Sequence, residues 1–152
     1  MASINTGKVI VGGLVAAVVA NAIDFVTNMY VLAPDYAELA KAHNMDPAAF
    51  NTPAVAMTWV AVDFVFGFLL VWSYAAMRPR FGPGIATAIL AALPLFLAPT
   101  AVILGFTMMG MFTMALFIKG TIGAVVSTFA AAIAGAAVYT EAPAASGSSA
   151  RV

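Results

Sequence analysis

The chain has 152 residues, of which 64% are hydrophobic and 8% are charged. Soluble domains carry charge on about a quarter of their residues, so this composition excludes a water-soluble globule and indicates that lipid covers most of the surface. The absence of cysteine excludes disulfides, thiolate metal sites and cysteine nucleophiles. Six basic residues balance six acidic ones, and no basic stripe indicates nucleic-acid binding.

Four apolar stretches follow one another along the chain, at residues 9–31, 54–77, 85–107 and about 114–139. Each exceeds the roughly 20 residues that cross a hydrocarbon core of about 30 Å. A spanning segment must satisfy its own backbone hydrogen bonds, which favours helices, and the alternation of a membrane β-strand is absent. The sequence therefore predicts an all-α bundle of four transmembrane helices, forming one domain over residues 1–141 and surrounded by the lipid bilayer.

The connections between these stretches differ in character. Residues 34–53 are polar, and Pro34–His43 reads as a short extracytoplasmic helix with proline and acids in its first turn. Residues 78–84 form a basic proline–glycine turn that we expect no helix to enter, and residues 105–113 form an uncharged turn. Residues 142–152 are of low complexity, which predicts a disordered tail.

The basic residues predict the orientation in the membrane. Lys8, Arg78, Arg80 and Arg151 fall on one side of a four-span arrangement, and only Lys41 falls on the other side. Because cytoplasmic loops carry an excess of lysine and arginine, we expect both termini in the cytoplasm. An alternative is that residues 1–22 form a cleaved signal peptide, but the apolar run continues to Val31, which favours an uncleaved span.

Three ionisable residues lie within the predicted spans: Asp24, Asp63 and Lys119. Each costs about 2.5–3.5 kcal/mol at a helix centre. All three lie roughly 5 to 9 residues from the outer ends of their helices, so their depths differ by only about 6 Å. We therefore expect them to meet in the outer half of the bundle, on a polar stripe that Asn21 and Asn28 extend along the first helix.

Small residues indicate the packing faces. The fourth predicted helix carries Gly123, Ser127, Ala131 and Gly135 in line with Lys119, and the second carries Gly67 near Asp63. Such small-residue ridges let helix backbones approach closely in membranes. The ionisable residues thus belong to the faces that we expect to pack.

Two interpretations of the charged cluster remain open. In the first, Lys119 pairs with one or both aspartates and fastens the bundle, or simply extends to the outer surface. In the second, the cluster binds an ion, a proton or a substrate, since intramembrane charges often mark functional sites. Two acids against one base leave a surplus carboxyl that is able to exchange a proton.

Prolines and methionines give weaker signals. Pro94 and Pro99 in the third helix each free a backbone carbonyl, which predicts a kink or a hinge. A methionine cluster at residues 108–114 has ligands suited to Cu(I), but methionine is equally an adaptable apolar filler. Neither this cluster nor the single His43 predicts a metal or a cofactor.

The stretches 8–15 and 21–28, the turn Met77-Arg-Pro-Arg-Phe-Gly-Pro-Gly84 and the ending Ala134-Gly-Ala-Ala-Val-Tyr139 resemble a group of small bacterial four-span membrane proteins with no assigned activity. The resemblance covers nearly the whole chain. It implies the four-span topology and a location in the bacterial inner membrane, and it brings no activity.

The sequence contains neither a nucleophile–base pair nor a phosphate-binding loop, which argues against an enzyme. The favoured prediction is a non-enzymatic accessory subunit that binds other membrane subunits or itself. The alternative is a small oligomeric proton-coupled transporter or channel that uses Asp24, Asp63 and Lys119.

Overall fold

The computed structural model describes residues 4–141, and the predicted tail at 142–152 lies outside them. The described chain is helical, with four helices that are long and apolar enough to cross a membrane. The first comprises α1 (Thr6–Val26) and the π-helical turn η1 (Thr27–Val31). The others are α3 (Pro53–Phe81), α4 (Ile85–Met108) and α5 (Met114–Val138). The predicted all-α, four-helix fold is confirmed.

A short excursion connects the first two spans. It consists of α2 (Ala33–Ala42) and the 3₁₀ turn η2 (Pro47–Asn51). The carboxylate of Asp46 accepts a hydrogen bond of 2.9 Å from the Ala48 amide and so caps η2. The helical connection predicted from Pro34 to His43 therefore begins one residue earlier and ends one residue earlier than its sequence pattern indicated.

Local capping explains where three of the spans begin. The side chains of Asn5, Thr52 and Thr113 accept hydrogen bonds from amides in the first turns of α1, α3 and α5, respectively. These caps satisfy donors that have no partner inside the helix. The boundaries of the spans therefore follow from single polar residues placed directly before apolar runs.

The turn between α3 and α4 differs from the prediction. Helix α3 continues through Pro79 to Phe81, one turn beyond the predicted end. Pro79 lacks the amide that would donate to the Ala75 carbonyl, and the helix continues for only two residues beyond it. The helix ends at Gly82, whose φ of 82° is unfavourable for other residues, and the Gly82 amide donates to the Arg78 carbonyl at 2.8 Å.

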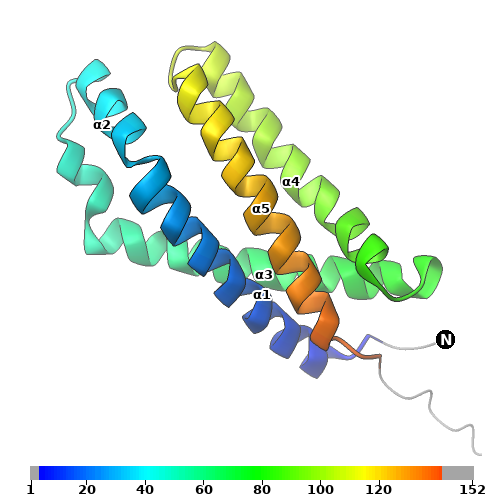
Figure 1. Cartoon of the computed structure of the whole chain (residues 1–152). Coiled ribbons are helices and arrows are strands. Elements are labelled where there is room, and N and C mark those ends of the chain that lie inside the picture. The colour runs from blue at the N-terminus through cyan, green and yellow to red at the C-terminus, as the bar shows by residue number, and fades with distance from the viewer. Residues whose placement is uncertain (1–3, 142–152) are drawn as a thin grey trace, which may run out of the picture.

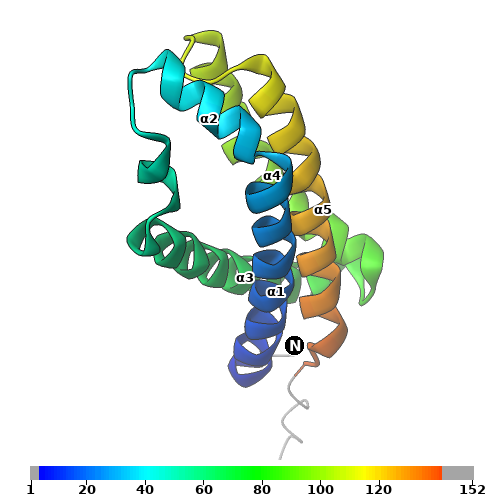
Figure 2. The same ribbon diagram turned by 60° about the vertical axis from the view of Figure 1, so that its left-hand side comes forward.

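The helices do not form a parallel bundle. The axes of α1, α4 and α5 are roughly aligned, with α5 antiparallel to α1 and α4, whereas α3 crosses them steeply (Figures 1 and 2). At about 1.5 Å per residue, the 29 residues of α3 extend roughly 43 Å, so the helix is long enough to cross a hydrocarbon core of about 30 Å with tilt. We call the end with Asn5, the α3–α4 turn and Glu141 the terminal end, and the end with α2 and the α4–α5 turn the far end.

Backbone contacts between small residues fix the crossing. A Cβ atom on Gly67 of α3 would lie 2.6 Å from the Gly13 carbonyl oxygen and 2.7 Å from the Ala17 nitrogen of α1. Gly12 of α1 and Gly135 of α5 are placed equally closely, each with its missing Cβ 2.8 Å from the carbonyl oxygen of the other. Because lipid tails are as apolar as the helix surfaces, the hydrophobic effect does not drive helices together inside a membrane. Close approach of the backbones supplies van der Waals packing energy instead.

Candidate functional site

Lys119 binds an aspartate that the sequence analysis did not pair with it. Its Nζ donates to both carboxylate oxygens of Asp35, at 3.0 and 2.8 Å. The expectation that Lys119 pairs with Asp24 or Asp63 is therefore wrong. The Asp35 side chain is 6% exposed and the Lys119 side chain 47% exposed, so the ion pair lies at the border of the packed region.

The fold of α2 explains this pairing. Leu32 and Leu39 pack with Leu116 of α5, and Tyr36 and Phe112 pack against the same cluster. This contact lays the first turn of α2 over the beginning of α5, where Asp35 reaches Lys119. The sequence showed an acid in the first turn of a short amphipathic helix, but it did not show that this helix folds back on the fourth span.

Asp24 and Asp63 lie on the faces of α1 and α3 that meet at the crossing. Asp24 continues the stripe of Gly13, Ala17 and Ala20 along α1, and Asp63 is one turn before Gly67 on α3. The Asp24 carboxyl faces the hydroxyl of Ser127 on α5. The carboxyls of Asp24 and Asp63 lie within range of each other's charge, and both residues are half-buried.

These two carboxyls have no cation beside them in the described part of the chain. The ion pairs within residues 4–141 are Lys119 with Asp35 and Arg78 with Glu141. The predicted cluster of two acids and one base thus separates into a fastened pair at α2 and two acids deeper in the bundle. Within the described spans, both carboxyls therefore lack a basic partner, one more than the sequence indicated.

The asparagines of the predicted stripe form local contacts. Asn21 donates to the Ala17 carbonyl at 3.0 Å, and Asn28 donates to the Asp24 carbonyl at 2.8 Å. Both are bonds to the backbone four residues earlier, which satisfy a polar side chain within its own helix. The side-chain oxygen of Asn28 also accepts a bond of 2.8 Å from the Tyr36 hydroxyl, so it ties α2 to the end of the first span.

The predicted packing residues lie at helix contacts. Gly67 and Gly135 form the close approaches described above, and Ser127 and Ala131 are buried on α5. A Cβ on Gly123 would lie 2.5 Å from a methyl carbon of Thr27, which places this glycine against the π-helical turn η1. Such turns in α-helices are rare and occur frequently at functional sites.

The first turns of α3 have almost no neighbours. Residues 56–62 are all exposed, although they form nearly two complete helical turns and so face every direction. Trp59 is 64% exposed and lies one turn before Asp63. On the terminal side of the crossing, the same helix is firmly packed, with Leu70 and Val71 fully buried. The charge of Asp63 thus lies where α3 leaves the packed region.

The two prolines of the predicted hinge lie inside α4, which runs without interruption from Ile85 to Met108. Both Pro94 and Pro99 are exposed. They therefore lie on the surface of α4 that faces away from its helix contacts.

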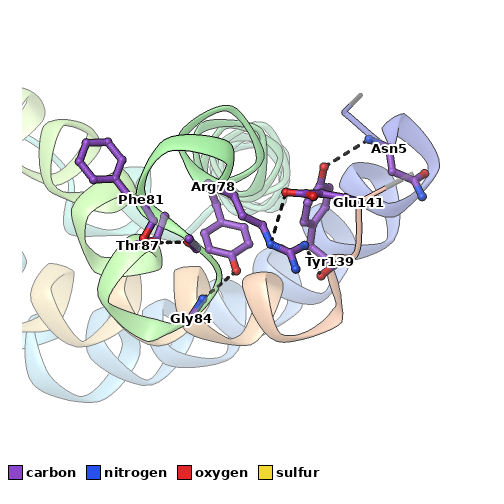
Figure 3. Close-up of polar contacts among 9 residues, drawn as sticks. Asn5, Arg78, Phe81, Gly84, Thr87, Tyr139 and Glu141 are labelled. Atoms are coloured by element: carbon purple, nitrogen blue, oxygen red, sulfur yellow. Dashed lines mark hydrogen bonds and ion pairs between the residues drawn. The ribbon is translucent and has the colours of Figure 1, made fainter. Parts of the chain in front are cut away.

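A second set of polar contacts, at the terminal end, was not predicted (Figure 3). The Tyr139 hydroxyl accepts a hydrogen bond of 3.2 Å from the Asn5 amide, and Arg78 donates to the Tyr139 carbonyl at 3.4 Å. The Arg78 guanidinium also lies 3.6 Å from Glu141 and 5.5 Å from the centre of the Tyr139 ring. These contacts join both ends of the described chain to the α3–α4 turn.

The other residues used to predict the orientation are peripheral. Lys8 is exposed, and Arg80 is exposed with its guanidinium over the Phe81 ring at 5.8 Å. Together with Arg78 they lie at the terminal end, where the described termini also lie. The sequence signal for the contacts of Arg78 was only its position beside a proline–glycine turn.

No protein-family model, curated protein or solved structure matches this chain. The geometry described above therefore carries the functional argument alone. It supports a small integral membrane protein with four membrane-spanning helices.

Proposed function

We propose that this chain is a non-enzymatic accessory subunit of a larger complex in the bacterial inner membrane, with its terminal end in the cytoplasm. The observation that carries the proposal is the exposure of α3 on every side over residues 56–62, directly before Asp63. A lone apolar helix face in lipid requires no partner, but an aspartate beside it is costly without one. Binding of another membrane protein to this segment removes that cost.

Site-specific photo-crosslinking tests the proposal on the full chain in its native membrane. The photoreactive aromatic residue p-benzoylphenylalanine replaces Trp59 in one variant and Trp72 in a second. Both tryptophans lie on α3 and are at least half exposed, at 64% and 50%, but Trp72 lies beside the packed region. We expect one defined adduct, of constant mass, from position 59 and a much weaker one from position 72.

Mild detergent extraction provides the second measurement. A subunit migrates with its crosslinked partner in a complex of fixed composition. Equal crosslinking from both positions, or migration as a free chain, would contradict the proposal.

A proton-coupled transporter is the second candidate, and the pair of carboxyls without a cation favours it. Asp24 and Asp63 lie within range of each other's charge, so such a pair is able to share and exchange a proton. The purified chain in vesicles would then carry protons along an imposed pH gradient, and the Asp24→Asn variant would not. An accessory subunit alone gives no such flux.

A further inference from the structure

The angle between α1 and α3 on the far side of their crossing is the most unusual part of the molecule. The helices touch where Gly67 meets Gly13 and Ala17, and they diverge from there toward the far end (Figures 1 and 2). Residues 56–62 of α3 remain exposed on every face, including the face that continues toward α1. Within residues 4–141, no segment packs against these turns.

The two aspartates border this angle. Asp24 lies on the α1 face that touches α3 at the crossing, and Asp63 lies on α3 one turn from the contact point. Each lies within range of the other's negative charge. When ionised, two carboxylates that border one apolar region favour a positive charge between them, because an uncompensated charge is strongly unfavourable in lipid.

Within residues 4–141, no ion pair joins a basic residue to either of these carboxyls. Lys119 is the only basic residue of the spans that lies toward the far end, and both oxygens of Asp35 hold its ammonium. The remaining basic residues of the described spans are Lys8, Arg78 and Arg80, and they lie at the terminal end. A second copy would bring two more carboxylates, and the lysine of its described spans would again be bound to Asp35, so the spans of a second copy do not offer these acids a cation.

We propose that the angle between α1 and α3 receives a transmembrane helix of a different membrane protein, and that a lysine or arginine of this helix binds Asp24 and Asp63. This inference rests on the proposed accessory function and names the chemistry of the partner. The diverging helices provide an apolar surface for the partner helix, and the two carboxyls select a basic residue at one depth. Charge complementarity thus fixes both the choice of partner and its register.

A designed helix tests this recognition without knowledge of the natural partner. The full chain carrying Trp72→Phe, so that Trp59 is its only tryptophan, is reconstituted in phosphatidylcholine vesicles. The probe is a leucine–alanine transmembrane peptide with a dansyl acceptor and one lysine level with Asp63. The control peptide has methionine in place of lysine. Energy transfer from Trp59 reports binding as the peptide-to-lipid ratio increases.

We expect the lysine peptide to reach half-maximal transfer at a ratio at least tenfold lower than the methionine peptide. The Asp24→Asn/Asp63→Asn variant removes that difference, whereas Glu38→Gln, at an exposed acid of α2, retains it. Asp63→Asn alone reduces the difference and serves as the milder variant if the double variant folds poorly. Equal binding of the two peptides, or a lysine preference that persists in the double variant, would overturn the inference.

The native complex separates this inference from the proposed function. If the wild-type chain migrates with its crosslinked partner and the double variant migrates with it equally well, the carboxyls are not the recognition site although the chain is an accessory subunit. If the wild-type chain migrates alone, the accessory function itself fails. If the purified chain carries protons by itself, the two carboxyls serve transport and the partner inference fails.

Discussion

At the crossing and on its terminal side, α3 lies against α1 at the spacing of backbone atoms and places the Val71 side chain against Gly135 of α5, whereas at the far end its first turns are exposed on every side. The terminal half contains the buried side chains Leu70, Val71 and Tyr74 and a set of hydrogen bonds that join both ends of the described chain. The far half contains the two aspartates, the π-helical turn and an ion pair to a surface helix.

This contrast assigns different tasks to the two halves. Close packing without freedom to rearrange is suited to a scaffold, and a diverging segment with charges is suited to recognition. The Gly67 crossing is the boundary between them. Changes in the terminal half should therefore reduce stability, and changes at the aspartates should alter binding with little effect on the fold.

The largest effect is expected from Gly67→Ala. The added Cβ would lie 2.6 Å from the Gly13 carbonyl oxygen, and this neighbour is backbone that cannot turn away. We expect a loss of about 3 kcal/mol or more in the free energy of unfolding, at the upper end of overpacking effects. Reversible unfolding in mixed detergent micelles, followed by circular dichroism, measures this change.

Gly105→Ala is the matched control, because it also adds a methyl group to a glycine within a span. Apart from the backbone of its own helix, no atom of the described structure lies within 4 Å of its added Cβ. We expect the free energy of unfolding to stay within roughly 0.5 kcal/mol, as at most exposed sites. An equal loss at both glycines would show that the crossing is not the scaffold of the bundle.

The second effect concerns the ion pair at the far end. Lys119→Met leaves the buried Asp35 carboxylate without its donor, and we expect a loss on the order of 2 kcal/mol. The loss is smaller than for a fully buried pair because solvent or headgroups reach the half-exposed lysine. Lys41→Met, at an exposed residue of α2, is the control.

Hydrogen exchange then locates the effect of Lys119→Met. Faster exchange in α2 with unchanged exchange around Val71 is expected, since the pair fastens α2 to α5 and does not contact the crossing. Faster exchange throughout the chain would contradict a division into two halves.

A smaller effect is expected from Tyr139→Phe at the terminal end. The variant loses the hydrogen bond that the Asn5 amide donates to the Tyr139 hydroxyl. It retains the ring under the Arg78 guanidinium. We expect a loss of about 1 kcal/mol, the usual net value of one hydrogen bond, measured in the same unfolding experiment. Tyr30→Phe, at an exposed tyrosine of η1, should change the stability less.

The sequence predicted the spans because a long apolar run in lipid has essentially one backbone solution. It also placed Gly67 and Gly135 on packing faces, since helical spacing alone fixes which residues share a side. It did not predict the partner of Lys119, because that pairing depends on how α2 folds back over α5. Lys119 was expected to meet Asp24 and Asp63 because the three residues lie at similar depths in the membrane. Depth alone does not determine the direction in which each side chain points.

The sequence did not predict the steep crossing of α3 either. Gly67 permits close approach at any angle, and the apolar residues before it suit lipid, protein or a partner equally well. The end of α3 was misplaced by one turn because proline was expected to end the helix, whereas α3 continues for two residues beyond Pro79. In each case the sequence fixes a local preference, and the tertiary arrangement decides among several ways to satisfy it.

The smallest expected effect is a shift in the pKa of Tyr36, which lies on α2 outside the spans. Burial raises the pKa of Tyr36 above its ordinary value of about 10, and the negative charges of Asp24 and Asp35 raise it further. The folded chain thus holds the phenol proton more tightly than the unfolded chain. This contribution to stability is complete below about pH 10 and is lost as the pH rises through the folded pKa.

The phenolate absorbance at 295 nm, taken as the difference between wild type and Tyr36→Phe, follows this group alone. Asp24→Asn should move its titration to lower pH because one of the neighbouring negative charges is removed, while Glu38→Gln should leave it in place. A titration that does not respond to Asp24→Asn would place the carboxyl away from α2. Because the Asp24 charge is felt both at α2 and at Asp63, a basic residue bound between the aspartates should also lower the pKa of Tyr36, which provides a readout of partner binding from within the far half.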